Sequence, residues 1–238
     1  LQAMIDSAGL THGFEVELNK RIKPGSGIGS SSASSCGAVV AANKLIGDPF
    51  TPEQLVAFAM EGEMLASGAR HADNVAPSIF GGFTLVRSID PLDIVRLDFP
   101  PLFATVIHPQ IEIKTSEARA MLPAKVPLHD AVRQWSNLGA FVAALAGGDY
   151  ALMSRSLEDV IVEPVRKTLI PLFDELRSAS KNTGALGGGI SGSGPSVFML
   201  SETEAAASNV EQEMRRIYSR TAIDFYTYVC PISRDGTG

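Results

Sequence analysis

A stretch rich in glycine and serine, residues 23–33, constrains the fold of this chain more than any other feature. It lies between an alternating apolar segment and a run of small residues, an order that predicts a strand, a loop and a helix N-terminus. Gly25, Gly27 and Gly29 lack a Cβ atom, so the backbone can turn sharply and approach a bulky anion. The serines at 30–32 offer hydroxyl and amide groups where a helix dipole is positive. The stretch predicts a loop for nucleotide phosphates, although a serine-capped glycine turn without a ligand explains it equally well.

Two common phosphate motifs fit this stretch poorly. A Walker A loop ends in Gly-Lys-Ser or Gly-Lys-Thr, and here no Lys follows Gly29. A dinucleotide-binding fingerprint needs a third glycine inside the helix. The candidate phosphate-binding residues are Lys23, Pro24, Gly25, Ser26, Gly27, Ile28, Gly29, Ser30, Ser31, Ser32 and Ala33.

Composition limits the class of function. The chain has 238 residues, of which 45% are hydrophobic, enough for one large or two modest domains with a core. A net charge of −6, a pI near 5.3 and the lack of a basic run argue against a nucleic-acid partner. Cys36 and Cys230 are far apart and lack metal-ligand spacing, so we expect neither a zinc site nor a disulfide, and a reducing, cytoplasmic setting. No apolar run is long enough to span a bilayer, so we expect no membrane partner.

The first residues of the sequence predict part of a helix. Residues 1–6 have the pattern of the middle of a helix, with no cap, and they lack the features of a signal peptide. We therefore expect further sequence upstream of Leu1.

The order of the predicted elements indicates an α+β chain. Apolar alternation predicts a half-buried strand over residues 14–22, small residues predict a buried helix over 30–46, and a Thr-Pro start predicts a helix over 51–66. Further strands are predicted at 83–87, 94–97, 103–108, 185–190, 196–200 and 225–229, and helices at 115–122, 128–146, 149–157, 165–180 and 202–218. This order favours two lobes, residues 1–100 and 101–238, over a regular parallel βαβ series.

Side chains suited to chemistry gather between residues 61 and 74. Glu61 and Glu63 lie near the end of a predicted helix, where a carboxylate can meet the cation that accompanies a nucleotide, because magnesium prefers oxygen ligands. His71 and Asn74 lie in a polar loop, and both can direct hydrogen bonds into one pocket. A solvated helix face and loop capping are the alternative interpretations.

Two arginines and a second glycine run complete the set of candidates. Arg119 and Arg166 lie in apolar helical contexts, where a guanidinium can bind a carboxylate through two N–H groups. A structural ion pair is the alternative for each. The glycines of residues 187–195 are dense enough to permit close backbone approach to another loop or a ligand, and a plain hairpin turn is the alternative.

Five ordered motifs resemble those of one kinase superfamily. Ile-Lys-Pro-Gly-Ser-Gly-Ile-Gly-Ser-Ser-Ser-Ala at 22–33 resembles the signature loop shared by galactokinase, homoserine kinase, mevalonate kinase and phosphomevalonate kinase. The other four are His-Ala-Asp-Asn-Val-Ala-Pro at 71–77 with Gly-Gly at 81–82, the run 115–123, Glu-Pro-Val-Arg at 163–166, and Gly-Ile-Ser-Gly-Ser-Gly-Pro at 189–195. Together, over almost the whole chain, they resemble the homoserine kinase family in particular.

The resemblance implies a fold and an activity. The fold has a ribosomal-protein-S5-like N-terminal lobe and a ferredoxin-like C-terminal lobe, and the activity is ATP-dependent phosphorylation of the side-chain hydroxyl of L-homoserine, a step toward threonine. By analogy, the loop at 23–33 wraps the ATP phosphates and Ser31 and Glu63 serve Mg²⁺. The residues implied to hold homoserine are His71, Asn74, Arg119 and Arg166, and those implied to be catalytic are Ser31, Glu63 and Asn74. Because Asn74 stands where mevalonate kinase-like members place an Asp base, catalysis is expected to rest on alignment, Mg²⁺ and loop dipoles.

The chain departs from the family pattern at two points, and two rival hypotheses stay open. Ile28 replaces the usual Leu or Met, a volume-conserving change that we expect to be harmless. The family also has several dozen residues before the equivalent of Leu1, which supply adenine contacts. The rivals are a related kinase for another small alcohol, disfavoured by Asn74 and the two arginines, and an inactive ligand-binding relative, disfavoured by Ser31 and Glu63. A homodimer is compatible with the sequence, which does not fix the oligomeric state.

Overall fold

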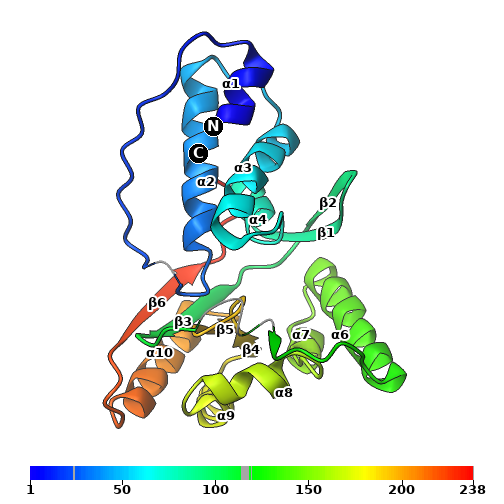
Figure 1. Cartoon of the computed structure of the whole chain (residues 1–238). Helices are drawn as coiled ribbons and strands as arrows, with labels where there is room; N and C mark the ends of the chain where they lie inside the picture. The colour runs from blue at the N-terminus through cyan, green and yellow to red at the C-terminus, as the bar shows by residue number, and fades with distance from the viewer. Residues whose placement is uncertain (24, 114–117, 119, 238) are drawn as a thin grey trace. The chain divides into compact units, whose positions relative to one another are not determined.

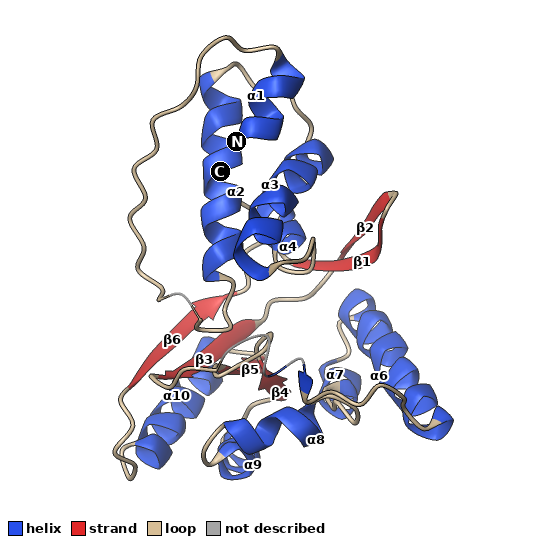
Figure 2. Cartoon of the chain, in the orientation of Figure 1, coloured by secondary structure: helices blue, strands red, loops and turns tan. Residues whose placement is uncertain are grey.

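The structure is a computed structural model that describes residues 1–23, 25–113, 118 and 120–237 (Figure 1). Its residues form two compact units. The first comprises Leu1–Pro24, Gly29–Asp98 and Ser233–Gly238, and the second comprises Gly25–Ile28 and Phe99–Ile232. Each unit has its own hydrophobic core. The α+β class is confirmed, because helices occur together with two separate antiparallel sheets (Figure 2).

The first unit is built on helices of small and apolar residues. They are α1 (Gln2–Ala8), α2 (Ser30–Leu45), α3 (Pro52–Ser67) and α4 (Val75–Phe80). A capping box starts α3: the hydroxyl of Thr51 accepts from the Gln54 amide, and the Gln54 side chain accepts from the Thr51 amide at 2.9 Å. Buried residues such as Cys36 and Val39 let α2 pack closely against α3 and α4. The helices predicted at 30–46 and 51–66 are thus confirmed.

A hairpin and a later segment complete the first unit. Strands β1 (Phe83–Ile89) and β2 (Leu92–Leu97) pair antiparallel. Residues 233–237 return to this unit, where the carbonyl of Ser233 accepts from the Gly82 amide at 2.8 Å and the Thr237 amide donates to the Ser78 carbonyl at 2.7 Å. A Cβ atom at Gly81 would lie 2.5 Å from the Arg234 carbonyl oxygen, so the backbones meet without room for a side chain. This segment therefore packs directly against the end of α4.

The strand predicted over residues 14–22 is wrong. These residues form a loop, drawn in tan in Figure 2. Val16 is 52% exposed and Leu18 is 56% exposed, so their alternation buries no face. A strand needs a neighbour that pairs with its backbone groups. Among the described residues, none forms a ladder with this segment.

The second unit contains a four-stranded antiparallel sheet in the order β4-β5-β3-β6. Its strands are β3 (Phe103–Pro109), β4 (Gly187–Ile190), β5 (Val197–Ser201) and β6 (Phe225–Pro231). Helix α9 (Phe173–Asn182) falls between β3 and β4 in the chain, and α10 (Glu204–Tyr218) between β5 and β6; both pack on the sheet. This βαββαβ order is the ferredoxin-like arrangement that the resemblance implied.

The helices that precede α9 correct one prediction. Helices α6 (Leu128–Gly147) and α7 (Tyr150–Ser156) occur as expected, but the single helix predicted over 165–180 is wrong. The chain instead forms α8 (Glu163–Arg166), the 3₁₀ turn η1 (Lys167–Leu169) and then α9. Pro171 has no N–H for a continuing helix, and Leu172 has a left-handed φ of 61°. Half of the helix predicted over 115–122, residues 115–117 and 119, lies outside the described residues.

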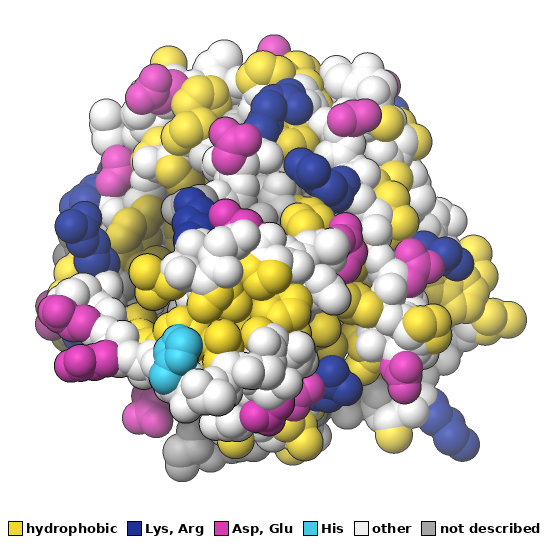
Figure 3. All heavy atoms as spheres, turned by 90° about the horizontal axis from the view of Figure 1, so that it is seen from above, with side chains coloured by type: hydrophobic (Ala, Val, Ile, Leu, Met, Phe, Trp, Pro, Cys, Tyr) yellow, Lys and Arg dark blue, Asp and Glu magenta, His cyan; other side chains and the backbone are white. Residues whose placement is uncertain are grey.

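Two further properties concern the helices and the surface charge of the described residues. No helix in the described part of the chain combines the length and apolar character that crossing a membrane requires. On the face drawn in Figure 3, Lys and Arg side chains are interspersed with Asp, Glu and hydrophobic side chains. The described residues on that face form no continuous basic patch.

Candidate active site

The first turn of α2 is the candidate anion-binding part of the first unit. Gly29 is the N-cap of the helix with φ 75°, and glycine has no side chain with which to cap the first amides. Ser30 is buried, and its hydroxyl donates to the Ile22 carbonyl at 3.0 Å, which fixes the approach to the helix. Ser31 and Ser32 follow in the same turn. The first turn thus has backbone N–H groups and a positive dipole end, the features with which a helix N-terminus can bind an anion.

A hydroxyl and a carboxylate meet beside this turn. Because α3 packs against α2, Glu63 lies next to Ser31, whose hydroxyl donates to Glu63 Oε2 at 3.3 Å. Glu63 is only 5% exposed. Glu61 instead pairs with Arg70 at 3.0 Å, and its side chain is 49% exposed. Two adjacent oxygen donors, one of them charged, fit Mg²⁺, which takes one or two protein ligands along with substrate phosphates.

Asn74 lies close to the start of α2. It is the N-cap of α4, and its side-chain atoms are 3.9 Å from the position that a Cβ atom on Gly29 would occupy. The hydroxyl of Ser78 donates to the Asn74 carbonyl at 2.7 Å, which fixes the backbone at this point. His71 is half-buried three residues earlier. The polar loop predicted to contain His71 and Asn74 ends at Asn74, since α4 begins at Val75.

In the second unit, two serines hold part of the glycine loop. The hydroxyl of Ser191 donates to the Gly27 carbonyl at 2.9 Å, and the buried hydroxyl of Ser196 donates to the Ser26 carbonyl at 2.6 Å. Gly27 has φ 77°, and a Cβ atom there would lie 2.5 Å from the Gly194 carbonyl oxygen. The dense glycines between β4 and β5 thus permit the approach of another loop, which confirms one of the two expectations for them. Ser191 lies in the motif at 189–195 and Ser196 follows that motif directly, but neither serine was among the predicted site residues.

Arg166 also contacts this hairpin. Its Nη1 donates to the Gly192 carbonyl at 3.1 Å and its Nε to the Ala118 carbonyl at 3.3 Å. Pro24 and Arg119 lie outside the described residues. The first unit contains Lys23, Gly29, Ser30, Ser31, Ser32, Ala33, Glu63, His71 and Asn74, and the second contains Gly25, Ser26, Gly27, Ile28 and Arg166. The contacts above join Ser31 with Glu63 and Gly29 with Asn74 in the first unit.

Comparison with known proteins gives consistent results along the chain. The model of the GHMP kinases N terminal domain matches residues 1–82, and that of the GHMP kinases C terminal domain matches residues 137–220. The homoserine kinase of Chloroherpeton thalassium is 46% identical over 226 residues, which cover 94% of this chain and 71% of that protein. The homoserine kinase of Pyrococcus furiosus is 39% identical over 98% of this chain and 78% of that protein.

Solved structures agree. The crystal structure of homoserine kinase from Cytophaga hutchinsonii matches with a TM-score of 0.96 and 47% identity, over 99% of this chain and 75% of that one. The crystal structure of L. major mevalonate kinase in complex with R-mevalonate matches with a TM-score of 0.60 at 17% identity, over 82% of this chain and 65% of that one, which shows a shared fold alone. Fold and matched domains define a small-molecule kinase of the GHMP class. Within that class, the chain belongs to the homoserine kinase family.

Proposed function

We propose that this protein transfers the γ-phosphoryl group of ATP to the side-chain hydroxyl of L-homoserine and so makes O-phospho-L-homoserine, in the cytoplasm, on the route to threonine. The observation that carries the proposal is the 46% identity with a homoserine kinase over 94% of the chain. The membership of the chain in a kinase family supports ATP as the phosphoryl donor.

In this proposal, the residues around the two glycine loops bind the phosphates of ATP and the magnesium ion. The first turn of α2 offers N–H groups to the phosphates. Ser31 and Glu63 would hold Mg²⁺, which supplies charge neutralisation at the transferring phosphoryl group. The 3.3 Å contact between these two side chains supports a shared role. Ser191 and Ser196 keep residues 26 and 27 in place.

The acceptor side of the proposal uses side chains that recognise an amino acid. Arg166 and Arg119 bind the homoserine carboxylate through paired N–H groups. His71 and Asn74 orient the amino acid, and the Asn74 amide cannot take up the hydroxyl proton at neutral pH. That proton therefore passes to the phosphate, and the enzyme contributes alignment and electrostatic stabilisation.

Phosphate transfer from ATP by the full-length protein to homoserine, mevalonate and galactose tests the proposal. We expect homoserine to be the preferred acceptor. Faster turnover of mevalonate or galactose would favour the rival kinase, and binding of homoserine without any transfer would favour the inactive relative.

A further inference from the structure

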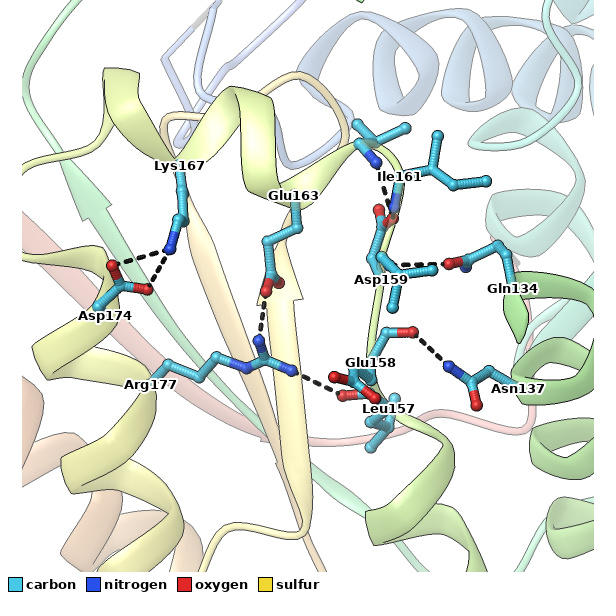
Figure 4. A network of polar contacts seen from close by, with 12 residues as sticks. Gln134, Asn137, Leu157, Glu158, Asp159, Ile161, Glu163, Lys167, Asp174 and Arg177 are labelled. Atoms are coloured by element: carbon cyan, nitrogen blue, oxygen red, sulfur yellow. Dashed lines mark hydrogen bonds and ion pairs between the residues drawn. The ribbon is translucent and has the colours of Figure 1, made fainter. Parts of the chain in front are cut away.

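A partly buried ion pair joins the short helix α8 to α9 in the second unit (Figure 4). Glu163, the first residue of α8, is 5% exposed, and Nη1 of Arg177 in α9 donates to its Oε1. Nη2 of the same guanidinium donates to the Leu157 carbonyl at 3.1 Å. One side chain of α9 therefore ties together the start of α8 and the end of α7. Loss of the Arg177 charge would leave the Glu163 carboxylate buried and uncompensated, which is unfavourable.

The glycines of β4 make room for this arrangement. A Cβ atom at Gly189 would lie 2.7 Å from Glu163 Oε2, and one at Gly187 would lie 2.9 Å from the Leu157 Cβ atom. These approaches are closer than real Cβ atoms allow. Gly187 and Gly189 are thus explained by the segments that carry Leu157 and Glu163, which pack directly on the strand.

Helix α8 depends on these contacts for its position. A helix of four residues has too few internal hydrogen bonds to be stable alone. Asp159 Oδ1 accepts from the Ile161 and Val162 amides at 2.8 Å each, which shapes the entry to the helix. After the helix, Lys167 Nζ donates to both carboxylate oxygens of Asp174 at 2.9 Å (Figure 4). Ion pairs to α9 therefore flank Arg166 on both sides in the sequence.

We infer that the Glu163–Arg177 pair positions the acceptor site, because it fixes α8 and thereby aims the Arg166 guanidinium at the carboxylate of the amino-acid substrate. The inference rests on the role of Arg166 in the proposed function. Glu163 is three residues from Arg166, and the contacts of Arg166 with the Gly192 and Ala118 carbonyls depend on where α8 lies. Glu163 and Arg177 are positioning residues here, since they act through Arg166.

A pH dependence accompanies this role. Burial raises the pKa of Glu163 to about 6, against the Arg177 charge, which lowers it. Asp159 and Asp174 also raise this pKa, and Lys167 lowers it. Below that pH the carboxyl gains a proton and the charge-charge attraction to Arg177 is lost. The kcat/KM for homoserine should therefore show an acid limb near pH 6 that the Glu163→Gln variant lacks.

A double-mutant cycle tests the inference. Glu163→Gln keeps the size of the side chain and removes its charge, and it should raise the homoserine KM about tenfold while kcat and the ATP KM stay within about twofold. In the Arg166→Ala background the same change should have little further effect, because the group that it positions is gone. Glu158→Gln is the matched control: it breaks an exposed ion pair with Arg133 and should leave all three constants unchanged.

Each result of the cycle decides something. Two results overturn the inference and leave the proposed function standing. One is that the effects of Glu163→Gln and Arg166→Ala on the homoserine KM are additive. The other is that Arg166→Ala raises the homoserine KM and Glu163→Gln leaves it unchanged. An unchanged homoserine KM in Arg166→Ala overturns the proposed role of Arg166 and the inference with it. If Glu163→Gln does not fold, Arg177→Lys takes its place, because lysine keeps the charge and lacks the two-pronged contact. Additivity of that variant with Arg166→Ala overturns the inference in the same way.

Discussion

Replacing Glu63 by glutamine should separate chemistry from folding in the first unit. The amide keeps the volume of a residue that is 5% exposed and keeps an oxygen that can accept from Ser31, so little packing is lost. What it removes is the negative charge that a magnesium ligand supplies. Loss of one electrostatic stabiliser of a transition state costs roughly 10²–10³ in kcat, or about 2.7–4 kcal/mol. We therefore expect kcat to fall at least about 10²-fold while the protein stays folded.

Glu61→Gln is the control for this variant. Side chains two residues apart on a helix point about 200° apart, and Glu61 lies at the surface in an ion pair with Arg70. Its replacement should be nearly silent, since an exposed pair contributes about 0–1 kcal/mol. The assay is phosphoryl transfer over a magnesium titration, after circular dichroism and thermal melting have shown that both variants fold. Normal turnover of Glu63→Gln, or loss of turnover in Glu61→Gln, would refute the assignment of the metal site.

Four further outcomes are expected. Arg119→Ala and Arg166→Ala should each weaken homoserine kinetics by roughly 2–5 kcal/mol in kcat/KM with little change in the ATP KM; unaffected homoserine kinetics would make these arginines structural. Ser196→Ala removes a hydrogen bond worth about 1 kcal/mol from the glycine loop, so the ATP KM should rise about fivefold in steady-state assays. Gly27→Ala should lower the melting temperature, because the added Cβ meets a carbonyl oxygen at 2.5 Å; an unchanged melting curve would contradict the close approach. The pKa of Glu163 rises from 4.5 to about 6 on folding, so the native state binds more protons than the unfolded state between these pH values. The contribution of Glu163 to the free energy of unfolding therefore falls as the pH rises from 4.5 to about 6. Denaturant titrations of Glu163→Gln should lack this pH dependence.

Local signals in the sequence predicted much of the fold. The Thr51-Pro52 start and its partner Gln54 form a capping box, a contact within one turn that depends on no distant residue. The strands of the β4–β5 hairpin could be predicted because glycine and proline mark the turn between them. The apolar alternation of residues 14–22 led to a wrong prediction of a strand. A strand also needs a neighbouring strand to pair with, and the segment itself does not show whether one is present.

The candidate site was predictable only where a motif specified it. Glu63 was preferred to Glu61 through the family resemblance, and its burial beside Ser31 is compatible with that choice. The hydrogen bond from Ser191 to the Gly27 carbonyl joins residues 164 positions apart, and no local pattern indicates such a contact. The break between α8 and α9 was missed although Pro171 was visible, because the apolar spacing around it continued with a helical period.

The return of residues 233–237 to the first unit has a consequence for biosynthesis. A ribosome makes residues 99–232, the main part of the second unit, before it makes the segment that docks against α4. The first unit therefore completes its packing after synthesis of the second, contrary to the usual order in which N-terminal domains fold first. Before residues 233–237 are made, the carbonyl of Ser78 and the amide of Gly82 lack the hydrogen bonds that they form with that segment. A nascent chain halted at residue 232 would lack part of its first unit and none of its second.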